Sequence, residues 1–144
     1  MCRTTGRASR RPGRPRCGNP TRPGRDQVVV NARFPKNRRL LKSAEFERVF
    51  QRRRSQSDGL LVLYGSANEL GYSRLGLVVS KRIGGAVERS RWKRCLREAF
   101  RLAQHELPQG MDFVALPRAG SSPTMPRVQE SLVRLARRLQ RGPR

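Results

Sequence analysis

The chain has 144 residues, which is enough for a single domain with a modest hydrophobic core. Its 33 lysines and arginines outnumber 10 acidic residues, so the formal net charge is +23, and a charge of this size favours a polyanionic partner. We expect that partner to be nucleic acid, with an anionic membrane surface as the alternative. No segment approaches the roughly 20 apolar residues of a membrane span. The cysteines form no C-x-x-C pair, which disfavours a disulfide framework and favours a reducing cytoplasm.

Residues 1–34 combine arginine with proline and glycine and contain few large apolar side chains. Such a composition cannot offset the entropy cost of ordering, so we expect a disordered basic extension before an RNA-binding domain over 35–141. In one interpretation the extension adds non-specific affinity for RNA. In another, the upstream residues are a mis-called start and translation begins near Val28 to Val30, which the intact mass of the native protein would decide.

Apolar periodicity and turn residues predict the order of secondary structure. The expected elements are a helix over 44–53, strands over 60–65 and 74–80, a helix over 85–104, a strand over 111–117 and a helix over 127–140. This α-β-β-α-β-α order predicts a single small α+β domain with a three-stranded sheet packed by helices. Its second strand, second helix and third strand form a β-α-β crossover, and the general rule makes such crossovers right-handed in about 98% of cases.

The first and last expected helices each have one apolar face. In the first, Phe46, Val49 and Phe50 recur at helical spacing, and Ser43 is expected to cap the amino end. In the last, the apolar residues are Val128, Leu132, Leu135 and Leu139. Each face predicts packing against the sheet.

The expected helix over 85–104 separates apolar from basic side chains. Its apolar face comprises Trp92, Cys95, Leu96, Ala99 and Ala103. The opposite face carries Ser90, Lys93, Arg94, Arg97 and Arg101. Because a core would anchor the apolar face, the cations form a fixed row suited to a phosphate backbone, where each neutralised phosphate releases counterions. The alternative interpretation is an ordinary solvated helix face.

Independent catalysis by the protein has little support in the sequence. His105 is the single histidine, and no cysteine and histidine spacing suits zinc. The carboxylates form no motif for two-metal chemistry, and Gly84-Gly85 lacks the ending of a nucleotide-binding loop. We therefore expect no catalytic side chain, no protein metal site and no small-molecule cofactor.

A set of short motifs surrounds the basic helix in a fixed order. They are Val79-Ser80-Lys81-Arg82, Ile83-Gly84, Ala86-Val87, Arg89-Ser90-Arg91, Lys93-Arg94 and Arg97-Glu98. In this order they resemble the signature of the bacterial ribonuclease P protein subunit. The segments RLLKSAEFERVF, LVLYG and DFVALPR extend the resemblance to roughly residues 36–139. One departure is Ser90, where the family has asparagine, because serine lacks the paired donor and acceptor of an amide. The extension before Phe34 is a second departure.

The resemblance implies a fold and a function. The fold is like domain 2 of ribosomal protein S5, with a left-handed β-α-β crossover that is an exception to the general rule. The protein would join a large catalytic RNA and promote removal of the 5′ leader from precursor tRNA. The RNA, with bound magnesium, would perform the phosphodiester hydrolysis.

Two groups of residues follow as candidate RNA contacts. The expected contacts of the catalytic RNA and of phosphates near the sheet end are Lys81, Arg82, Arg89, Ser90, Arg91, Lys93, Arg94, Arg97 and Arg101. The resemblance places the single-stranded leader in a cleft between the sheet and the first helix, with Phe46, Phe50, Tyr64, Val78 and Ser80 as its expected lining. Aromatic rings there would stack on unpaired bases, each stack contributing roughly 1–3 kcal/mol. For the aromatic residues the alternative is ordinary core packing.

Two other functions stay open on sequence grounds. One is a ribosome-associated or other structural RNA-binding protein without a role in processing. The other is a protein nuclease that cleaves without RNA. The ordered motifs favour the ribonuclease P subunit over both.

Overall fold

The computed structural model describes residues 34–142, so the expected extension and the alternative start lie outside the described residues, except for Phe34. The helices are α1 (Ser43–Gln51), α2 (Ala86–Ala103) and α3 (Met125–Arg141), with short 3-10 helices η1 (Lys36–Arg38) and η2 (Lys81–Ile83). The strands are β1 (Ser55–Ser57), β2 (Leu61–Ala67), β3 (Arg74–Leu77) and β4 (Met111–Pro117). All six expected elements are therefore present.

The strands form one mixed sheet in the order β1-β2-β4-β3. β2 is antiparallel to β1 and β4, whereas β3 and β4 are parallel neighbours joined through α2. This confirms the β-α-β unit and corrects the expected three strands to four. The additional strand, Ser55-Gln56-Ser57, has no apolar side chain, so periodicity could not reveal it. It is held by backbone pairing, with Gln56 opposite Leu63.

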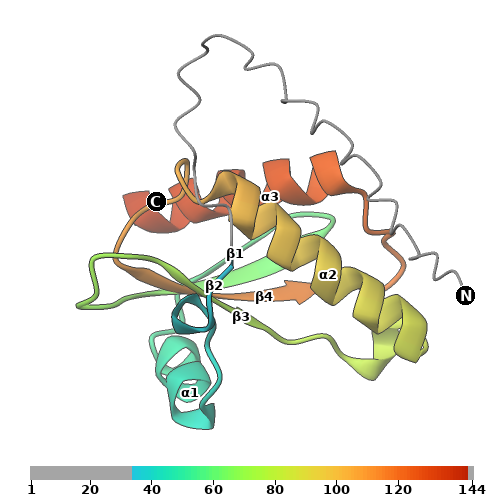
Figure 1. The fold of residues 1–144 in the computed structure, drawn as a ribbon, viewed down its shortest axis with the longest axis horizontal. Coiled ribbons are helices and arrows are strands. Elements are labelled where there is room, and N and C mark those ends of the chain that lie inside the picture. The colour runs from blue at the N-terminus through green and yellow to red at the C-terminus, as the bar shows by residue number, and fades with distance from the viewer. Residues whose placement is uncertain (1–33, 143–144) are drawn as a thin grey trace, which may run out of the picture. The chain divides into compact units, whose positions relative to one another are not determined.

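The helices cover the two faces of the sheet unequally (Figure 1). α2 and α3 lie together on one face, where Trp92, Phe100, Phe113, Leu96 and Leu132 form the centre of the main core. On this face α3 packs over β1 and β2, while α2 contacts β3. The expected apolar faces of α2 and α3 are both buried, so their predicted orientation is confirmed.

α1 lies on the other face of the sheet (Figure 1). Val49 of α1, Val114 of β4 and Leu40 form a small buried cluster there. Partly buried side chains surround it, namely Phe46, Phe50, Tyr64, Val78 and Leu116. Because β4 faces a core on both sides, its residues from Met111 to Ala115 are all buried.

The ends of several elements differ from the expectations, and two of these differences have a clear local cause. α1 begins at Ser43 and Lys42 occupies the N-cap position, so Ser43 is not the cap. Instead, the Glu45 carboxylate accepts hydrogen bonds from the Leu41 and Lys42 amides at 3.2 and 3.3 Å. The strand expected over 74–80 ends at Leu77, although the Val78 amide still donates to the Ala115 carbonyl at 3.1 Å.

Helices within residues 34–142 include none that is both long and apolar enough to cross a membrane.

Candidate RNA-binding surfaces

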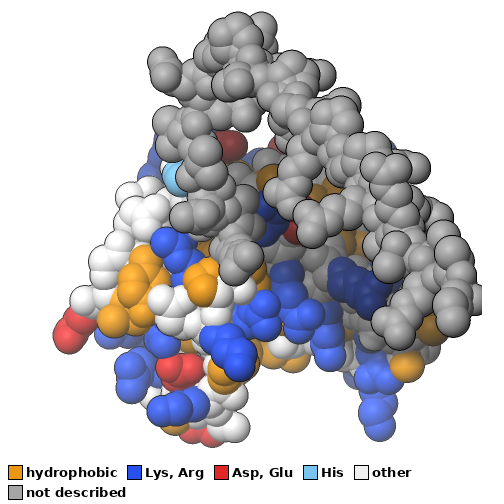
Figure 2. Space-filling model, in the orientation of Figure 1, with side chains coloured by type: hydrophobic (Ala, Val, Ile, Leu, Met, Phe, Trp, Pro, Cys, Tyr) orange, Lys and Arg blue, Asp and Glu red, His pale blue; other side chains and the backbone are white. Residues whose placement is uncertain are grey.

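The outer face of α2 presents the expected row of cations. We define the α2 surface as Ser90, Lys93, Arg94 and Arg97, of which the first three are exposed and Arg97 is half-buried. Trp92, Leu96 and Ala99 on the opposite side are at most 1% exposed. The buried side therefore fixes the position of the helix, so the backbone that carries the cations is held in place. Figure 2 shows lysine and arginine side chains across the visible face between α2 and α1.

Arg101 is not equivalent to the rest of the row. Its guanidinium donates a hydrogen bond from Nε to Glu98 at 2.9 Å and makes an ion pair with the same carboxylate. The hydrogen bond from Arg101 holds the pKa of Glu98 below its ordinary value. The row thus contains an internal counter-charge at its carboxyl end.

The three side chains of the expected motif Arg89-Ser90-Arg91 point in different directions. Arg89 is half-buried, and its Nε is buried without a hydrogen-bond partner among the described residues. Ser90 faces outward. Arg91 lies on the other edge of α2 and lines a hollow of about 460 Å³ with Glu88, Trp92 and the loop 120–124. A helical repeat of 100° per residue places consecutive residues on different sides, so the motif presents no single flat face.

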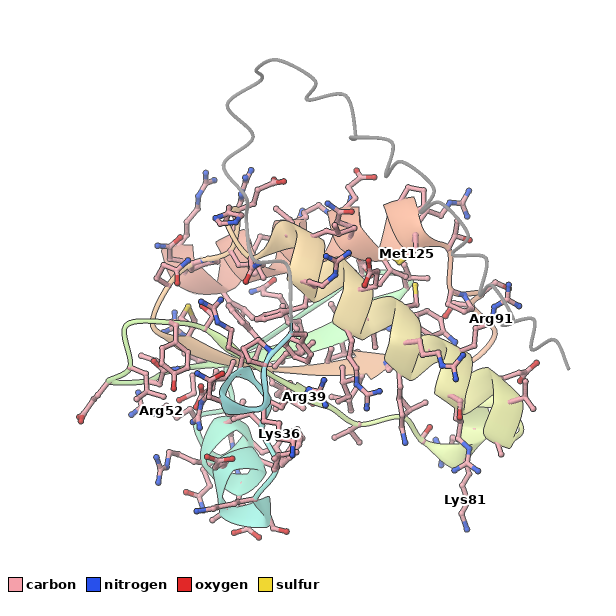
Figure 3. The ribbon with its side chains drawn as sticks, viewed as in Figure 1. Lys36, Arg39, Arg52, Lys81, Arg91 and Met125 are labelled. Atoms are coloured by element: carbon pink, nitrogen blue, oxygen red, sulfur yellow. The ribbon has the colours of Figure 1, made fainter. Side chains whose placement is uncertain are left out.

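The turn before α2 carries Lys81 and Arg82, which are both exposed. Figure 3 shows Lys81 and Arg91 pointing to different sides of the amino end of α2. Gly84 makes this turn at a φ of 145°, a conformation that other residues rarely adopt. The backbone conformation therefore favours glycine in this turn, beside the exposed Glu88 side chain.

A second surface forms where α1 meets the sheet. We define the aromatic surface as Phe46, Phe50, Tyr64 and Val78, which the structure brings together as half-buried side chains. The rings of Phe50 and Tyr64 lie 4.9 Å apart at 75°, an edge-to-face contact. Half-burial is compatible with both core packing and base stacking, since each ring packs on the core and keeps a solvent-facing part. Ser80, the remaining expected member, is exposed at the start of η2 and outside this cluster.

The two surfaces meet at the β3 edge of the sheet. A hollow of about 270 Å³ there is lined by Phe34, Arg39, Leu40, Leu41, Phe46, Leu75, Leu77, Lys93 and Arg97. It joins cations of α2 to a ring of α1. Arg39 is a member that sequence reasoning missed, although it lies in a visible basic run, residues 36–39. Its guanidinium sits 5.0 Å from the Phe34 ring, and Nη2 donates to the Phe34 carbonyl at 3.1 Å.

A network of charges fixes α1 against the sheet. Arg74 of β3 donates to Glu45 of α1 at 2.7 Å and to Asp112 of β4 at 2.6 and 2.8 Å. Hydrogen bonding to Asp112 is the main reason that the pKa of Arg74 is raised. Burial raises the pKa of Glu45, but hydrogen bonds from Arg74 and the two backbone amides outweigh it, so the pKa is lowered. Asn68 also donates to Asp112, at 2.6 Å.

Several acidic side chains of the described chain are occupied by protein donors. Within residues 34–142, no three His, Cys, Asp or Glu side chains are grouped so that they could hold a metal ion. Asp112 and Glu45 bind arginine, and Asp58 binds backbone amides, a hydroxyl and Arg134. The exposed cations beside them offer surfaces that suit a polyanion.

Comparison with known proteins agrees with this arrangement. The family model described as Ribonuclease P matches residues 34–140. The ribonuclease P protein component of Escherichia coli O6:H1 is 42% identical over 120 residues, which cover 80% of this chain and all of the relative. That of Photorhabdus laumondii is 46% identical over 93 residues, covering 64% of this chain and 77% of the relative.

Solved structures give the same result. The RNase P protein from Thermotoga maritima superposes with a TM-score of 0.64 at 33% identity, covering 69% of this chain and 96% of that one. The RNase P protein of Staphylococcus aureus gives a TM-score of 0.62 at 30% identity, covering 69% and 93%. The chain therefore belongs to the ribonuclease P protein family, whose members are the protein component of a tRNA-processing endoribonuclease.

Proposed function

We propose that this accessory subunit binds the catalytic RNA of ribonuclease P through the α2 surface and holds the 5′ leader of precursor tRNA on the aromatic surface. The observation that carries the proposal is the hollow at the β3 edge, where Lys93 and Arg97 of α2 lie beside Phe46 of α1. Cations there can neutralise phosphates, and a ring beside them can stack on an unpaired base. A single-stranded segment that reaches the catalytic RNA would pass this point.

The remaining expected contacts lie around the hollow at the β3 edge. Lys81, Arg82, Arg89 and Arg91 surround the amino end of α2 and would bind phosphates of the catalytic RNA on more than one side. Arg101 would contribute less than the others, because Glu98 already neutralises part of its charge. Ser80, which lies outside the aromatic surface, would contact RNA at the exposed start of η2.

Magnesium belongs to the RNA in this proposal. When bound, it would activate water and stabilise the charge that develops on phosphate oxygens. Glu45, Asp112 and Asp58 do not fit such a site, since arginines and backbone amides occupy them. The contribution of the protein is to bind and orient two RNAs. The reducing cytoplasm, where we expect the assembly to work, suits the buried and unpaired thiol of Cys95.

The test is cleavage of precursor tRNA at low, near-physiological magnesium. The samples are catalytic RNA alone, protein alone, and both together. We expect cleavage only, or much faster, in the combined sample. Tight RNA binding without stimulation would instead indicate a structural RNA-binding protein, and cleavage by the protein alone would indicate an independent nuclease.

A further inference from the structure

α3 carries a second row of arginines that the proposed function does not use. Its members lie seven, four and three residues apart, on one side of the helix: Arg127, Arg134, Arg138 and Arg141. At 1.5 Å per residue the row extends over roughly 21 Å. One of them, Arg134, is neutralised by Asp58 at 2.8 Å. For Arg127, Arg138 and Arg141, no ion pair with a carboxylate occurs in the described part of the chain.

This row faces away from α2. Arg134 reaches Asp58 in the turn between β1 and β2, and Arg138 lies against β1. α2, by contrast, contacts β3 at the other end of the sheet order. The two basic rows therefore lie on opposite flanks of the helical layer, and a straight RNA helix bound on one flank would not follow the other.

A small hollow of about 150 Å³ lies at the β1 end of this row. Arg53, which follows α1, and Arg138 of α3 both line it, so arginines from two separate segments border one hollow. Arg54 closes the hollow and is used structurally, because its Nη2 donates to the Leu139 carbonyl at 2.9 Å. Arg53 has no carboxylate partner within the described chain. The guanidinium groups of Arg53 and Arg138 suit a phosphate, which accepts hydrogen bonds and carries negative charge.

The backbone of Arg53 strengthens this reading. Its φ is 49°, and among the described residues it is the one non-glycine residue in the left-handed region. It follows the end of α1, where glycine or asparagine is usual because other side chains are strained. An arginine therefore occupies a position where glycine would fit the backbone better. We take this as a sign that the guanidinium of Arg53 has a binding role.

We propose that Arg53, Arg127, Arg138 and Arg141, the α3 surface, bind the phosphate backbone of a second RNA segment while the α2 surface holds the first. The inference rests on the proposed function for α2 and adds a bridging role. The second segment is either another part of the catalytic RNA or part of precursor tRNA. In both cases the recognised group is the phosphodiester backbone.

The test compares salt-dependent affinities of the full chain. The triple variant Arg53→Gly, Arg138→Ala and Arg141→Ala removes three cations while relieving the backbone at residue 53 and keeping good helix formers in α3. We expect the slope of log affinity for catalytic RNA against log salt to fall by about 2 to 3 in magnitude. Thermal unfolding checks that the variant folds. The pair Arg138→Lys and Arg141→Lys keeps the charge and should retain a slope close to that of the original chain.

Arg137→Ala is the matched control, because Arg137 lies on the same helix but already pairs with Glu106 at 3.3 Å. It should change the slope little. A second comparison, Arg94→Ala with Arg97→Ala, removes two of the three cations of the α2 surface. If these α2 changes weaken binding and the triple variant does not, for either catalytic RNA or precursor tRNA, the α3 inference is wrong and the proposed function stands.

The other outcomes are equally decisive. A slope reduced for catalytic RNA identifies the second segment as part of that RNA, and a reduction confined to precursor tRNA bound to the RNA–protein complex identifies it as tRNA. Both outcomes support the α3 surface. If neither the α2 nor the α3 changes alter any RNA affinity, the proposed function fails and the inference fails with it.

Discussion

Gly76 is the residue that sets the depth of the aromatic surface. It is buried in β3, and a Cβ added there would lie 2.6 Å from Cε1 of Phe46 and 3.1 Å from Cδ1 of Leu40. The requirement for glycine is therefore close approach of a ring, not a left-handed backbone. The absence of a side chain at one residue allows the Phe46 ring to approach the sheet closely, in the hollow that Lys93 and Arg97 of α2 also line.

Gly76→Ala should consequently impair leader binding. The added methyl must displace the Phe46 ring, which overpacks the site and lowers the free energy of unfolding by about 1–3 kcal/mol. Partial loss of one base stack should raise the Kd for precursor tRNA by about fivefold, equivalent to about 1 kcal/mol. Mature tRNA, which lacks the leader, should bind as before. Gly71→Ala is the control, since a Cβ at Gly71 meets no atom within 4 Å. Equal effects on precursor and mature tRNA would contradict this role for Phe46.

At the scale of elements, polar side chains decide where α1 and β1 lie. α1 shares only a small cluster with the sheet, and its amino end is fixed by Glu45 binding to Arg74. The turn between β1 and β2 is fixed in a similar way by Asp58. Its carboxylate accepts hydrogen bonds from the Leu60 and Leu61 amides at 2.9 and 2.8 Å, and from Ser131 and Arg134 of α3. This side chain therefore connects β1 to the main core.

The Asp58 contacts predict a specific pH dependence. Burial raises the pKa of Asp58, but hydrogen bonds from Ser131, Arg134 and the backbone outweigh it and hold the pKa well below the ordinary value of 3.8. Because the folded pKa is the lower one, the stabilisation is complete above pH 3.8 and is lost as the pH falls from there towards the folded pKa. Asp58→Asn should lower the free energy of unfolding at neutral pH by about 1.5–3 kcal/mol. The variant should also lose less stability than the original chain on acidification.

Denaturant unfolding at several pH values checks this prediction. Glu106→Gln is the control, because the Glu106–Arg137 pair is more than half exposed and an exposed pair contributes at most about 1 kcal/mol. Parallel acid curves for Asp58→Asn and the original chain would show that other carboxylates cause the acid sensitivity.

The contrast between apolar packing and polar contacts explains what could be predicted from the sequence. Helices and strands with apolar periodicity were predictable, because the buried faces of α2 and α3 follow directly from residue spacing. β1 was not, since its pairing uses the backbone and its side chains are polar. The clustering of Phe46, Phe50, Tyr64 and Val78 followed from family resemblance. The contribution of Arg39 depends on contacts with Phe34 and β3, which no local pattern contains.

For the whole molecule, charge imposes opposite demands on folding and binding. A formal net charge of +23 repels itself in the compact state. The described ion pairs neutralise only part of it, and the two basic rows on α2 and α3 place some of the remaining positive charge on opposite flanks. A polyanion bound to both flanks would relieve the repulsion, so RNA binding and stability are expected to be coupled.

Sodium chloride should therefore act with opposite signs on the free protein and on the complex. Raising its concentration from about 0.05 to 0.5 M shortens the Debye length and screens self-repulsion, so the Tm of the free protein should rise by several degrees. The same change should weaken RNA affinity, because counterion release then contributes less. The variant with Arg53→Gly, Arg138→Ala and Arg141→Ala carries three fewer positive charges and should show a smaller rise in Tm. A Tm that is independent of salt would mean that the exposed cations are too far apart to repel, and the coupling between charge and folding would have to be abandoned.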